Sequence, residues 1–526
     1  MQKIIISFLI FFSFHLLLRS QIVHEDWVQK FGSNTETINT LSGPLIDKMG
    51  NVFISGTVSS STLSDYVTIK YNSAGVLQWT KKFSFRIEDR VVDMALDNEG
   101  NVCVTGLSEN LTGTYDIITI KYNTDGDSLW GNRYNGETAF TMDQPVAMDI
   151  DNNNNVLVSG YSFGSTPMTL VTIKYSPQGD SLWIKRFALG GTDIPKDIYA
   201  DDNGNVYVYG RGTRIIKYDT NGNELWNRIY QFSGSESNKV LTGDASGNIY
   251  FGAKKFTSTF DDFVIVKLDP DGDTLWTKIR NGFGGLLTTH DDINAVCLDK
   301  DDNVLITGEI YNAGPVSFAT LKYSSEGVFQ WERNYYDPLN GMGGKDIVCD
   351  ALGNIYVTGG SIDFITLKYN SAGDSLWSIR YNGPANQVDF GSSIAIDNNS
   401  NLYVTGRSRL GTGLSGYEAV TIKYTQTLTG ISAEEIRSKD YYLNQNYPNP
   451  FNPKTIISYD LKESGKLVSL KVYDVLGNEV ATLINERQNS GSYKIEFDGS
   501  KLSSSIYFYK LVTENYSEIK RMMLVK

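Results

Sequence analysis

The sequence predicts an all-β protein: an eight-bladed β-propeller closed by its N-terminal strand, followed by a small Ig-like β-sandwich. Two strand motifs each recur eight times, about 50 residues apart, separated by turns rich in Gly, Asn and Asp. A repeat of this length built only of short strands is typical of four-stranded propeller blades. The aromatic content of 12% suits pleated, half-buried strands.

The first motif is a strand that begins at Asn and ends at Gly. Its copies span residues 51–56, 101–106, 155–160, 205–210, 248–252, 303–308, 354–359 and 401–406. The second motif is a strand with a central lysine between large apolar residues, at Lys70, Lys121, Lys174, Lys217, Lys267, Lys322, Lys368 and Lys423. Period-2 alternation places the lysine on the opposite face from its apolar neighbours. Each repeat is therefore expected to hold four strands, with the Asn-to-Gly strand second and the lysine strand third.

The tryptophans predict how the ring closes. Seven repeats end in a strand with a Trp, the last at Trp377, and no such strand follows Lys423. The missing strand lies at the other end of the chain, where residues 24–31 contain Trp27 without a repeat before them. The N-terminal segment is expected to be the outer strand of the last blade, which removes an open sheet edge. Seven blades remain the alternative, with the weak copy around Lys217 outside the ring.

The first 20 residues are predicted to be an export signal. Lys3 precedes a mostly apolar run over residues 4–18, which is short for a membrane span, and no later segment resembles a stop-transfer sequence. We therefore expect a protein that works outside the cytoplasm and has no transmembrane span.

Charge excludes one class of partner. The formal net charge is −13, which disfavours binding to nucleic acid. The segment from residue 441 onward is about +2 by contrast, and this shift indicates a domain boundary. We expect the propeller over residues 21–425, a polar linker over 426–440 and a second domain over 441–526.

The second domain opens with a proline-rich motif and continues as alternating strands, expected at residues 455–460, 468–474, 493–497, 506–512 and 519–525. The motif consists of Asn446, Tyr447, Pro448, Asn449, Pro450, Phe451, Asn452 and Pro453. Gly477 lies in a predicted hairpin turn after the second strand. About 85 residues of this kind fit a small antiparallel sandwich.

These features resemble a known family. The proline-rich motif, the strand and turn through Gly477 and the ending Lys-Arg-Met-Met-Leu-Val-Lys are similar to the type A C-terminal sorting domain of the type IX secretion system. The resemblance implies export across the outer membrane, interaction with the secretion machinery, removal by a sortase-like peptidase and, in some members, attachment to surface lipopolysaccharide. The repeats resemble the bacterial propeller repeat family, which specifies the fold and leaves the ligand open.

The search for catalytic groups finds no constellation. Beyond the predicted signal only His24 and His290 remain, and no His-Glu-x-x-His occurs. The Gly-x-Ser-x-Gly at residues 160–164 follows a strand but does not lead into a helix, so it lacks the setting of a nucleophile elbow. We predict no catalytic, cofactor-binding or metal-ligating residue.

Acidic side chains leave two alternatives open. The Asp-rich turns at residues 269–273 and 299–302 could hold Ca²⁺ through carboxylate oxygens, but the same turns recur in every repeat, which favours capping of the turn backbone. Asp93, Asp197 and Asp346 occupy equivalent places on the innermost strands, where other repeats have Ala147, Ala295 or Ser393. These three carboxylates are expected to line the central channel, either solvated or binding a cation or basic group.

Cys103, Cys297 and Cys349 lie in predicted strands and are expected to be small buried hydrophobes. A bridge between Cys297 and Cys349 on neighbouring blades is the alternative.

Two functions remain. The first is a secreted or cell-surface, non-catalytic module that binds a protein or glycan through its loops, such as residues 59–64, 282–290 and 407–416. The second is a propeller dehydrogenase similar to the quinoproteins, with a quinone cofactor and Ca²⁺. The adjacent-Cys pair and the haem-binding motif of that family are absent from the sequence, and this favours the binding module.

Overall fold

The computed structural model describes residues 20–33, 35–136, 141–163, 168–188, 194–210, 212–234, 240–256, 261–280, 291–311, 316–337, 343–411, 416–429, 442–443, 446, 448–461, 464–474, 478–513 and 517–526. Most of the predicted signal, His290, Tyr447, Gly477 and linker residues 430–440 lie outside them, as do loop residues 282–290 and 412–415. Residues 21–427 form one compact unit, and the residues from Leu428 onward belong to another.

The described residues of the first unit form eight antiparallel sheets, most of them with four strands in chain order. Blade 1 holds β2 (Thr37–Ile46), β3 (Val52–Ser59), β4 (Ser64–Tyr71) and β5 (Leu77–Phe83). Blade 2 holds β6 (Asp89–Leu96), β7 (Val102–Glu109), β8 (Tyr115–Tyr122) and β9 (Ser128–Tyr134). Blade 3 holds β10 (Met142–Ile150), β11 (Val156–Phe163), β12 (Thr169–Tyr175) and β13 (Ser181–Ala188). Blade 4 holds β14 (Pro195–Ala200), β15 (Val206–Gly210), β16 (Arg214–Tyr218) and β17 (Glu224–Ile229).

The second half of the ring repeats the pattern. Blade 5 holds β18 (Ser233–Gly234), β19 (Leu241–Gly243), β20 (Ile249–Phe256), β21 (Asp261–Leu268) and β22 (Thr274–Arg280). Blade 6 holds β23 (Asp292–Leu298), β24 (Val304–Tyr311), β25 (Val316–Tyr323) and β26 (Phe329–Tyr335). Blade 7 holds β27 (Gly344–Cys349), β28 (Ile355–Gly359), β29 (Phe364–Tyr369) and β30 (Ser375–Tyr381). Blade 8 holds β31 (Asp389–Ile396), β32 (Leu402–Arg409) and β33 (Tyr417–Thr429), with a fourth strand from the N-terminus.

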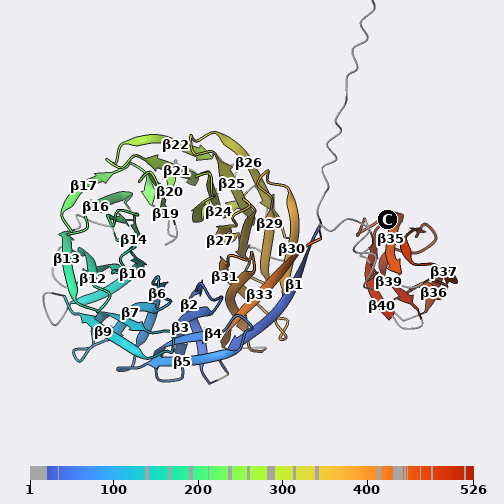
Figure 1. Cartoon of the computed structure of the whole chain (residues 1–526), viewed down its shortest axis with the longest axis horizontal. Helices are drawn as coiled ribbons and strands as arrows, with labels where there is room; N and C mark the ends of the chain where they lie inside the picture. The colour runs from blue at the N-terminus through green and yellow to red at the C-terminus, as the bar shows by residue number, and fades with distance from the viewer. Residues whose placement is uncertain are drawn as a thin grey trace, which may run out of the picture. The chain divides into compact units, whose positions relative to one another are not determined.

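The blades stand side by side in a ring, with the first strand of each blade nearest the centre (Figure 1). Innermost strands of neighbouring blades contact one another around the ring, including β31 of blade 8 and β2 of blade 1. The copy around Lys217 forms a regular blade, β14–β17. The described sheets therefore number eight, and the seven-bladed alternative is wrong.

The N-terminal strand β1 (Ser20–Phe31) supplies the outer strand of blade 8. The strand order of this sheet is β1-β33-β32-β31, so the first and last strands of the propeller are hydrogen-bonded neighbours. Asp26 of β1 pairs with Lys423 of β33 at 3.0 Å, and Lys30 pairs with Glu418. The two ends of the ring are thus held by a strand ladder and by charge.

A β-bulge explains the glycine at the end of the Asn-to-Gly motif, although the second strand of most blades runs on past this glycine. In blade 2 the innermost strand shifts register between Val91 and Asp93, opposite Gly106. The shift brings the Arg90 carbonyl oxygen within 2.1 Å of the place that a Cβ on Gly106 would occupy. Any side chain there would collide with backbone, so this position requires glycine.

The core consists of separate clusters between facing blades. Side chains of β3 and β4 pack with the last blade through Tyr403 and Ala419, with Trp27 at the edge. The next cluster joins Phe53 of blade 1 to Val102, Val104 and Ile118 of blade 2. No blade covers both of its own faces, so each depends on its neighbours, as expected for an array of sheets.

The predicted boundary between propeller and linker needs correction. β33 continues to Thr429, four residues into the expected linker of 426–440. Gln426 belongs to the propeller, because its amide donates to the Ser400 carbonyl at 2.6 Å. The long β1 explains the difference, since the extra residues of β33 extend the edge along which it pairs.

The C-terminal unit is a sandwich of two antiparallel sheets. One has the order β34 (Tyr442–Leu443), β35 (Lys454–Leu461) and β38 (Gly491–Asp498). The other has the order β37 (Glu479–Gln488), β36 (Lys466–Tyr473), β39 (Ser505–Val512) and β40 (Ser517–Leu524). Residues of both sheets share one core, which includes Tyr459, Phe497, Val472 and Tyr509.

The sequence analysis did not assign the strand β37. Its sequence, EVATLINERQ, lacks clean alternation, and its register with β36 shifts twice. Across the described residues of the whole chain, no helix has the length and apolar character needed to cross a membrane.

Candidate functional site

Each blade carries an acidic turn between its first and second strands. In blade 8 the Asp397 carboxylate accepts hydrogen bonds from the backbone N–H groups of Asn399 (2.8 Å) and Asn401 (2.9 Å), and from the side-chain amide of Asn401 (2.8 Å). Ser400 takes a positive φ of 61° here. The same arrangement at Asp299 and at the other copies shows that these carboxylates cap their own turns.

The contacts of the lysine that recurs in each blade differ with the residue opposite it on the second strand, although Lys267, opposite Tyr250, makes both kinds of contact. Where the second strand has Cys or Leu, the lysine pairs with the turn carboxylate: Lys121–Asp97 at 2.8 Å, Lys174–Asp151 at 2.9 Å and Lys322–Asp299 at 2.8 Å. Burial alone would raise the pKa of Asp97, but hydrogen bonds from Lys121 and Asn101 hold it below its ordinary value.

Where the second strand has Tyr, its hydroxyl donates to the turn carboxylate and the lysine lies over the ring. Tyr356 donates to Asp350 at 2.8 Å, and the Lys368 Nζ lies 4.8 Å from its ring centroid. Tyr403 donates to Asp397 at 3.1 Å, with the Lys423 Nζ 5.8 Å from the ring. Burial raises the pKa of both phenols. The aromatic face thus helps to compensate a buried cation.

Seven of the eight blades are each connected to the next by one backbone carbonyl that accepts two hydrogen bonds. The lysine ammonium and the tryptophan indole N–H of a blade both donate to the second residue of the outer turn in the following blade. Lys70 and Trp79 donate to the Thr124 carbonyl at 2.8 and 3.1 Å. Lys423 and Trp27 donate to the Ser73 carbonyl at 2.8 and 3.2 Å, which latches blade 8 to blade 1.

The latch between blades 7 and 8 differs, because β33 runs on where other blades turn. Lys368 donates instead to the Gln426 side-chain oxygen at 2.7 Å. The Trp377 indole nitrogen is buried and has no hydrogen-bond partner among the described residues. Burial lowers the pKa of Lys368 to about 8, although Asp350 opposes the change. Among the described residues, the lysine and the tryptophan of this junction therefore do not share an acceptor.

We predict opposite outcomes for one substitution at two latches. Trp79→Phe removes an indole N–H that donates to a carbonyl, whereas Trp377→Phe removes a buried indole N–H that has no acceptor among the described residues. Both substitutions shorten the aromatic side chain by a similar amount. An unsatisfied buried donor costs about 1–3 kcal/mol. Trp377→Phe is therefore expected to unfold at higher denaturant concentration than Trp79→Phe, by about 1–3 kcal/mol in free energy of unfolding. Equal stabilities in urea titrations would contradict the latch.

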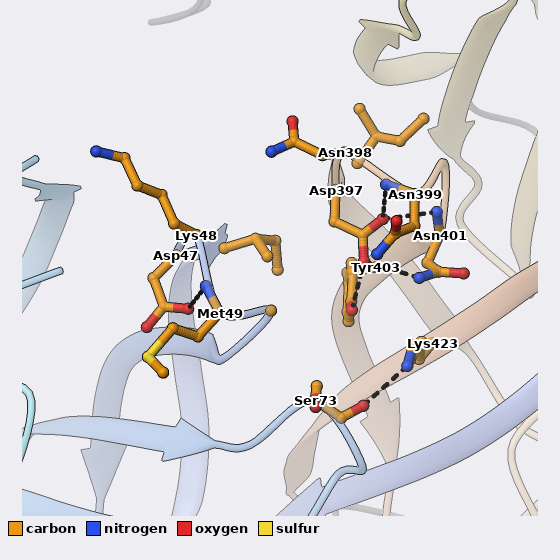
Figure 2. A pocket seen from close by; sticks show the side chains of 13 residues that line it. Asp47, Lys48, Met49, Ser73, Asp397, Asn398, Asn399, Asn401, Tyr403 and Lys423 are labelled. Atoms are coloured by element: carbon orange, nitrogen blue, oxygen red, sulfur yellow. Dashed lines mark hydrogen bonds between the residues drawn. The ribbon is translucent and has the colours of Figure 1, made fainter.

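A pocket lies between the acidic turns of blades 8 and 1, next to the closing strand. Its cavity volume is about 520 Å³, and its lining includes Asp47, Lys48, Asn398, Asn399 and Lys423. Figure 2 shows the two turns facing each other across the pocket, with Ser73 and Lys423 between them. The pocket therefore forms only when the ring closes.

The pocket wall is polar and held in place. Met49 N–H donates to the Asp47 carboxylate at 2.9 Å, so the blade 1 turn is capped like the others. Within the described residues, the side-chain amides of Asn398 and Asn399 make no hydrogen bond, and both are exposed. They are donors and acceptors available to a ligand. The sequence analysis missed this pocket, although the predicted ring closure already made blades 8 and 1 neighbours.

The three acidic residues predicted on the innermost strands accept hydrogen bonds from the backbone of the following blade. Asp93 accepts the Met148 N–H at 3.0 Å, and Asp346 accepts the Ile394 N–H at 3.1 Å. Asp197 accepts the N–H groups of Val240 (3.0 Å) and Leu241 (2.9 Å).

Burial raises the pKa of Asp197, against the hydrogen bonds that lower it. Asp149, which the sequence analysis did not single out, makes the same contact to Ala200, and burial raises its pKa to about 6. The lining of a channel and cation binding by the three predicted residues stay predictions.

No group of three or more His, Cys, Asp or Glu side chains that could hold a metal ion occurs among the described residues. His24 lies exposed in β1. Residues 160–163 of the Gly-x-Ser-x-Gly continue β11, and Gly164 lies outside the described residues.

The proline-rich motif connects the start of the C-terminal domain to the end of its last strand through hydrogen bonds. The Phe451 N–H donates to the Met523 carbonyl at 2.9 Å, and Val525 donates back at 3.0 Å. Asn446 is buried and donates to Thr455 at 2.9 Å. Pro448, Asn449, Pro450 and Asn452 are exposed, and Pro453 is half-buried. The motif thus has a buried inner side and an exposed outer side, on which Asn449 still accepts a hydrogen bond from the Met523 N–H at 2.8 Å.

Two family models match the chain. Residues 445–526 match the secretion system C-terminal sorting domain, and residues 182–214 and 376–409 match a beta-propeller repeat. An uncharacterized WD repeat-containing protein of Acanthamoeba polyphaga mimivirus is 24% identical over an alignment of 204 residues, which covers 28% of this chain and 14% of that protein. The chain thus spans only a small part of that curated relative.

Solved structures share the propeller. The Dos1 propeller superposes with a TM-score of 0.50 at 8% identity, covering 77% of this chain and 95% of that one. The C-terminal WD40 domain of Sif2 has a TM-score of 0.49 at 12% identity, covering 77% and 98%. Identities this low concern the fold alone. The chain is a β-propeller repeat protein with a type IX secretion system C-terminal sorting domain, and it is secreted or displayed at the cell surface.

Proposed function

We propose that the propeller is a non-catalytic binding module at the cell exterior, and that it takes a polar ligand, a glycan or a protein segment, in the pocket between blades 8 and 1. The observation that carries this proposal is the pocket itself, about 520 Å³ and lined by amides, carboxylates and ammonium groups. A cavity of this size can hold a few sugar rings or a short peptide turn.

The chemistry of the wall favours a glycan over an apolar ligand. Asn398 and Asn399 offer both donors and acceptors, which match sugar hydroxyl groups. The wall is rigid because its carboxylates are fixed by their own turns, so ordering of the protein costs little on binding. In this proposal the C-terminal domain, and not the propeller, interacts with the type IX secretion machinery, the sortase-like peptidase and lipopolysaccharide.

The test is a binding screen with a matched pair of variants. The full exported protein is applied to glycan and peptide arrays, and positives are measured by calorimetry. Asn399→Ala should weaken binding about tenfold, the loss of one or two hydrogen bonds to a ligand. Asn153→Ala is the control, since Asn153 holds the same turn position in blade 3 and is also exposed.

Equal affinities for both variants would place the ligand elsewhere. Addition of a quinone and Ca²⁺ in the same experiment tests the dehydrogenase alternative, which requires a cofactor absorbance and oxidation of an alcohol or sugar.

A further inference from the structure

Two cysteines face each other across the junction between blades 6 and 7. Cys297 lies on the innermost strand β23 and Cys349 on the innermost strand β27, and these strands are in contact. Their Sγ atoms are 3.3 Å apart. Both are half-buried, which corrects the expectation of full burial, whereas Cys103 is fully buried.

The ring geometry fixes this approach. Cys349 directly precedes the turn residue Asp350, and Cys297 stands two places before the equivalent Asp299. At three other junctions the same two positions hold apolar residues of one core cluster, Leu45 with Leu96, Ala95 with Ile150 and Val348 with Ile396. The contact is thus a property of the fold, and only at this junction do the described residues fill it with two thiols.

We propose that Cys297 and Cys349 form an inter-blade disulfide in the exported protein. A disulfide needs its sulfurs at about 2.05 Å, so they must approach by about 1.3 Å, a shift that small side-chain rotations supply. Disulfides persist outside the cytoplasm, where this protein works. The bond closes a loop of one full repeat between blades 6 and 7, and blade 7 stands next to the closing blade 8 (Figure 1).

The oxidant is the disulfide of a periplasmic thiol–disulfide exchange protein. One cysteine thiolate attacks that disulfide, forms a mixed disulfide and releases one thiolate of the oxidant. The second cysteine then attacks the mixed disulfide, which forms the Cys297–Cys349 bond and releases the second thiolate. Two protons leave the cysteines, and two electrons reduce the oxidant to its dithiol.

The first attack is expected during folding, before blades 6 and 7 dock, and docking then brings the second thiol to the mixed disulfide. In the folded ring the hydrogen bond from Cys349 and burial raise the pKa of Cys297, which keeps its thiol protonated and slow to react.

The test counts thiols in protein collected outside the cell and denatured in N-ethylmaleimide without reductant. One of the three cysteines should be alkylated, Cys103, and all three after reduction. Alkylation of all three before reduction would overturn the proposal, as would a disulfide-linked dimer on a non-reducing gel.

Variants assign the pair. Cys103→Ser should leave no thiol to alkylate before reduction, whereas Cys297→Ser should leave two, Cys103 and Cys349. Reduction should lower the melting temperature of the wild type by several degrees and leave that of Cys297→Ser unchanged, because only the wild type loses a cross-link. Equal shifts in both proteins would contradict the bridge.

Discussion

Deletion of residues 21–31 is expected to lower the melting temperature of the propeller by about 10 °C or more, because it removes the outer strand of blade 8. The loss includes the Trp27 latch to Ser73 and the ion pairs of Asp26 with Lys423 and Lys30 with Glu418. Truncation of a buried Trp costs about 3–5 kcal/mol, and Trp27 is partly buried, so its own share is expected to be smaller than that. Thermal unfolding of the full chain with this internal deletion, followed by circular dichroism, measures the effect.

The deletion also exposes the edge of β33, an open strand that invites pairing between molecules. The shortened protein is therefore expected to aggregate at temperatures where the wild type stays monomeric in light scattering.

Point variants distinguish the loss of ring closure from a general loss of stability. Trp27→Ala should reproduce a large part of the loss, whereas Glu25→Ala, exposed on the same strand, should change stability by less than about 0.5 kcal/mol. An unchanged melting temperature in the deletion would mean that the ring closes in another way.

The recurring strand motifs allowed the fold to be predicted from the sequence. Eight copies of the Asn-to-Gly strand and of the lysine strand give the number of blades, and the missing Trp after Lys423 points to Trp27 as its replacement. Such features are local, since each depends on period-2 alternation and on the residues that tight turns require. For the same reason β37, whose alternation is irregular, was not assigned.

Contacts between blades could not be predicted from the sequence in the same way. The approach of Cys297 to Cys349 and the clasp from Asp197 to Val240 depend on how the bulged innermost strands align across a junction. Sequence shows that Asp197 is on an innermost strand but not which backbone N–H it meets. The pocket belongs to the same class, because its two walls are more than 300 residues apart in the chain.

Removal of residues 430–526 is expected to leave the propeller folded, with its melting temperature close to that of the wild type, but absent from the cell exterior. Residues 21–427 form a compact unit with its own core clusters, and β33 ends at Thr429, so this cut removes no propeller strand. The sorting domain at residues 445–526 is the part that carries export. Immunoblots of periplasm, cell surface and medium measure where the shortened chain accumulates.

Single substitutions in the proline-rich motif test whether export depends on the fold of this domain or only on its presence. Phe451 is buried, packs against Phe497 with tilted rings whose centroids are 5.9 Å apart, and exchanges backbone hydrogen bonds with Met523 and Val525. Phe451→Ala should therefore cost about 3–5 kcal/mol and unfasten β40 from the motif. Asn452 is its exposed neighbour, and Asn452→Ala should leave the sandwich intact.

If the secretion machinery recognises a folded sandwich, Phe451→Ala blocks export and Asn452→Ala does not. If it reads the outer side of the motif, Asn452→Ala reduces export at unchanged stability. Normal export of the chain that lacks residues 430–526 would refute the sorting role altogether.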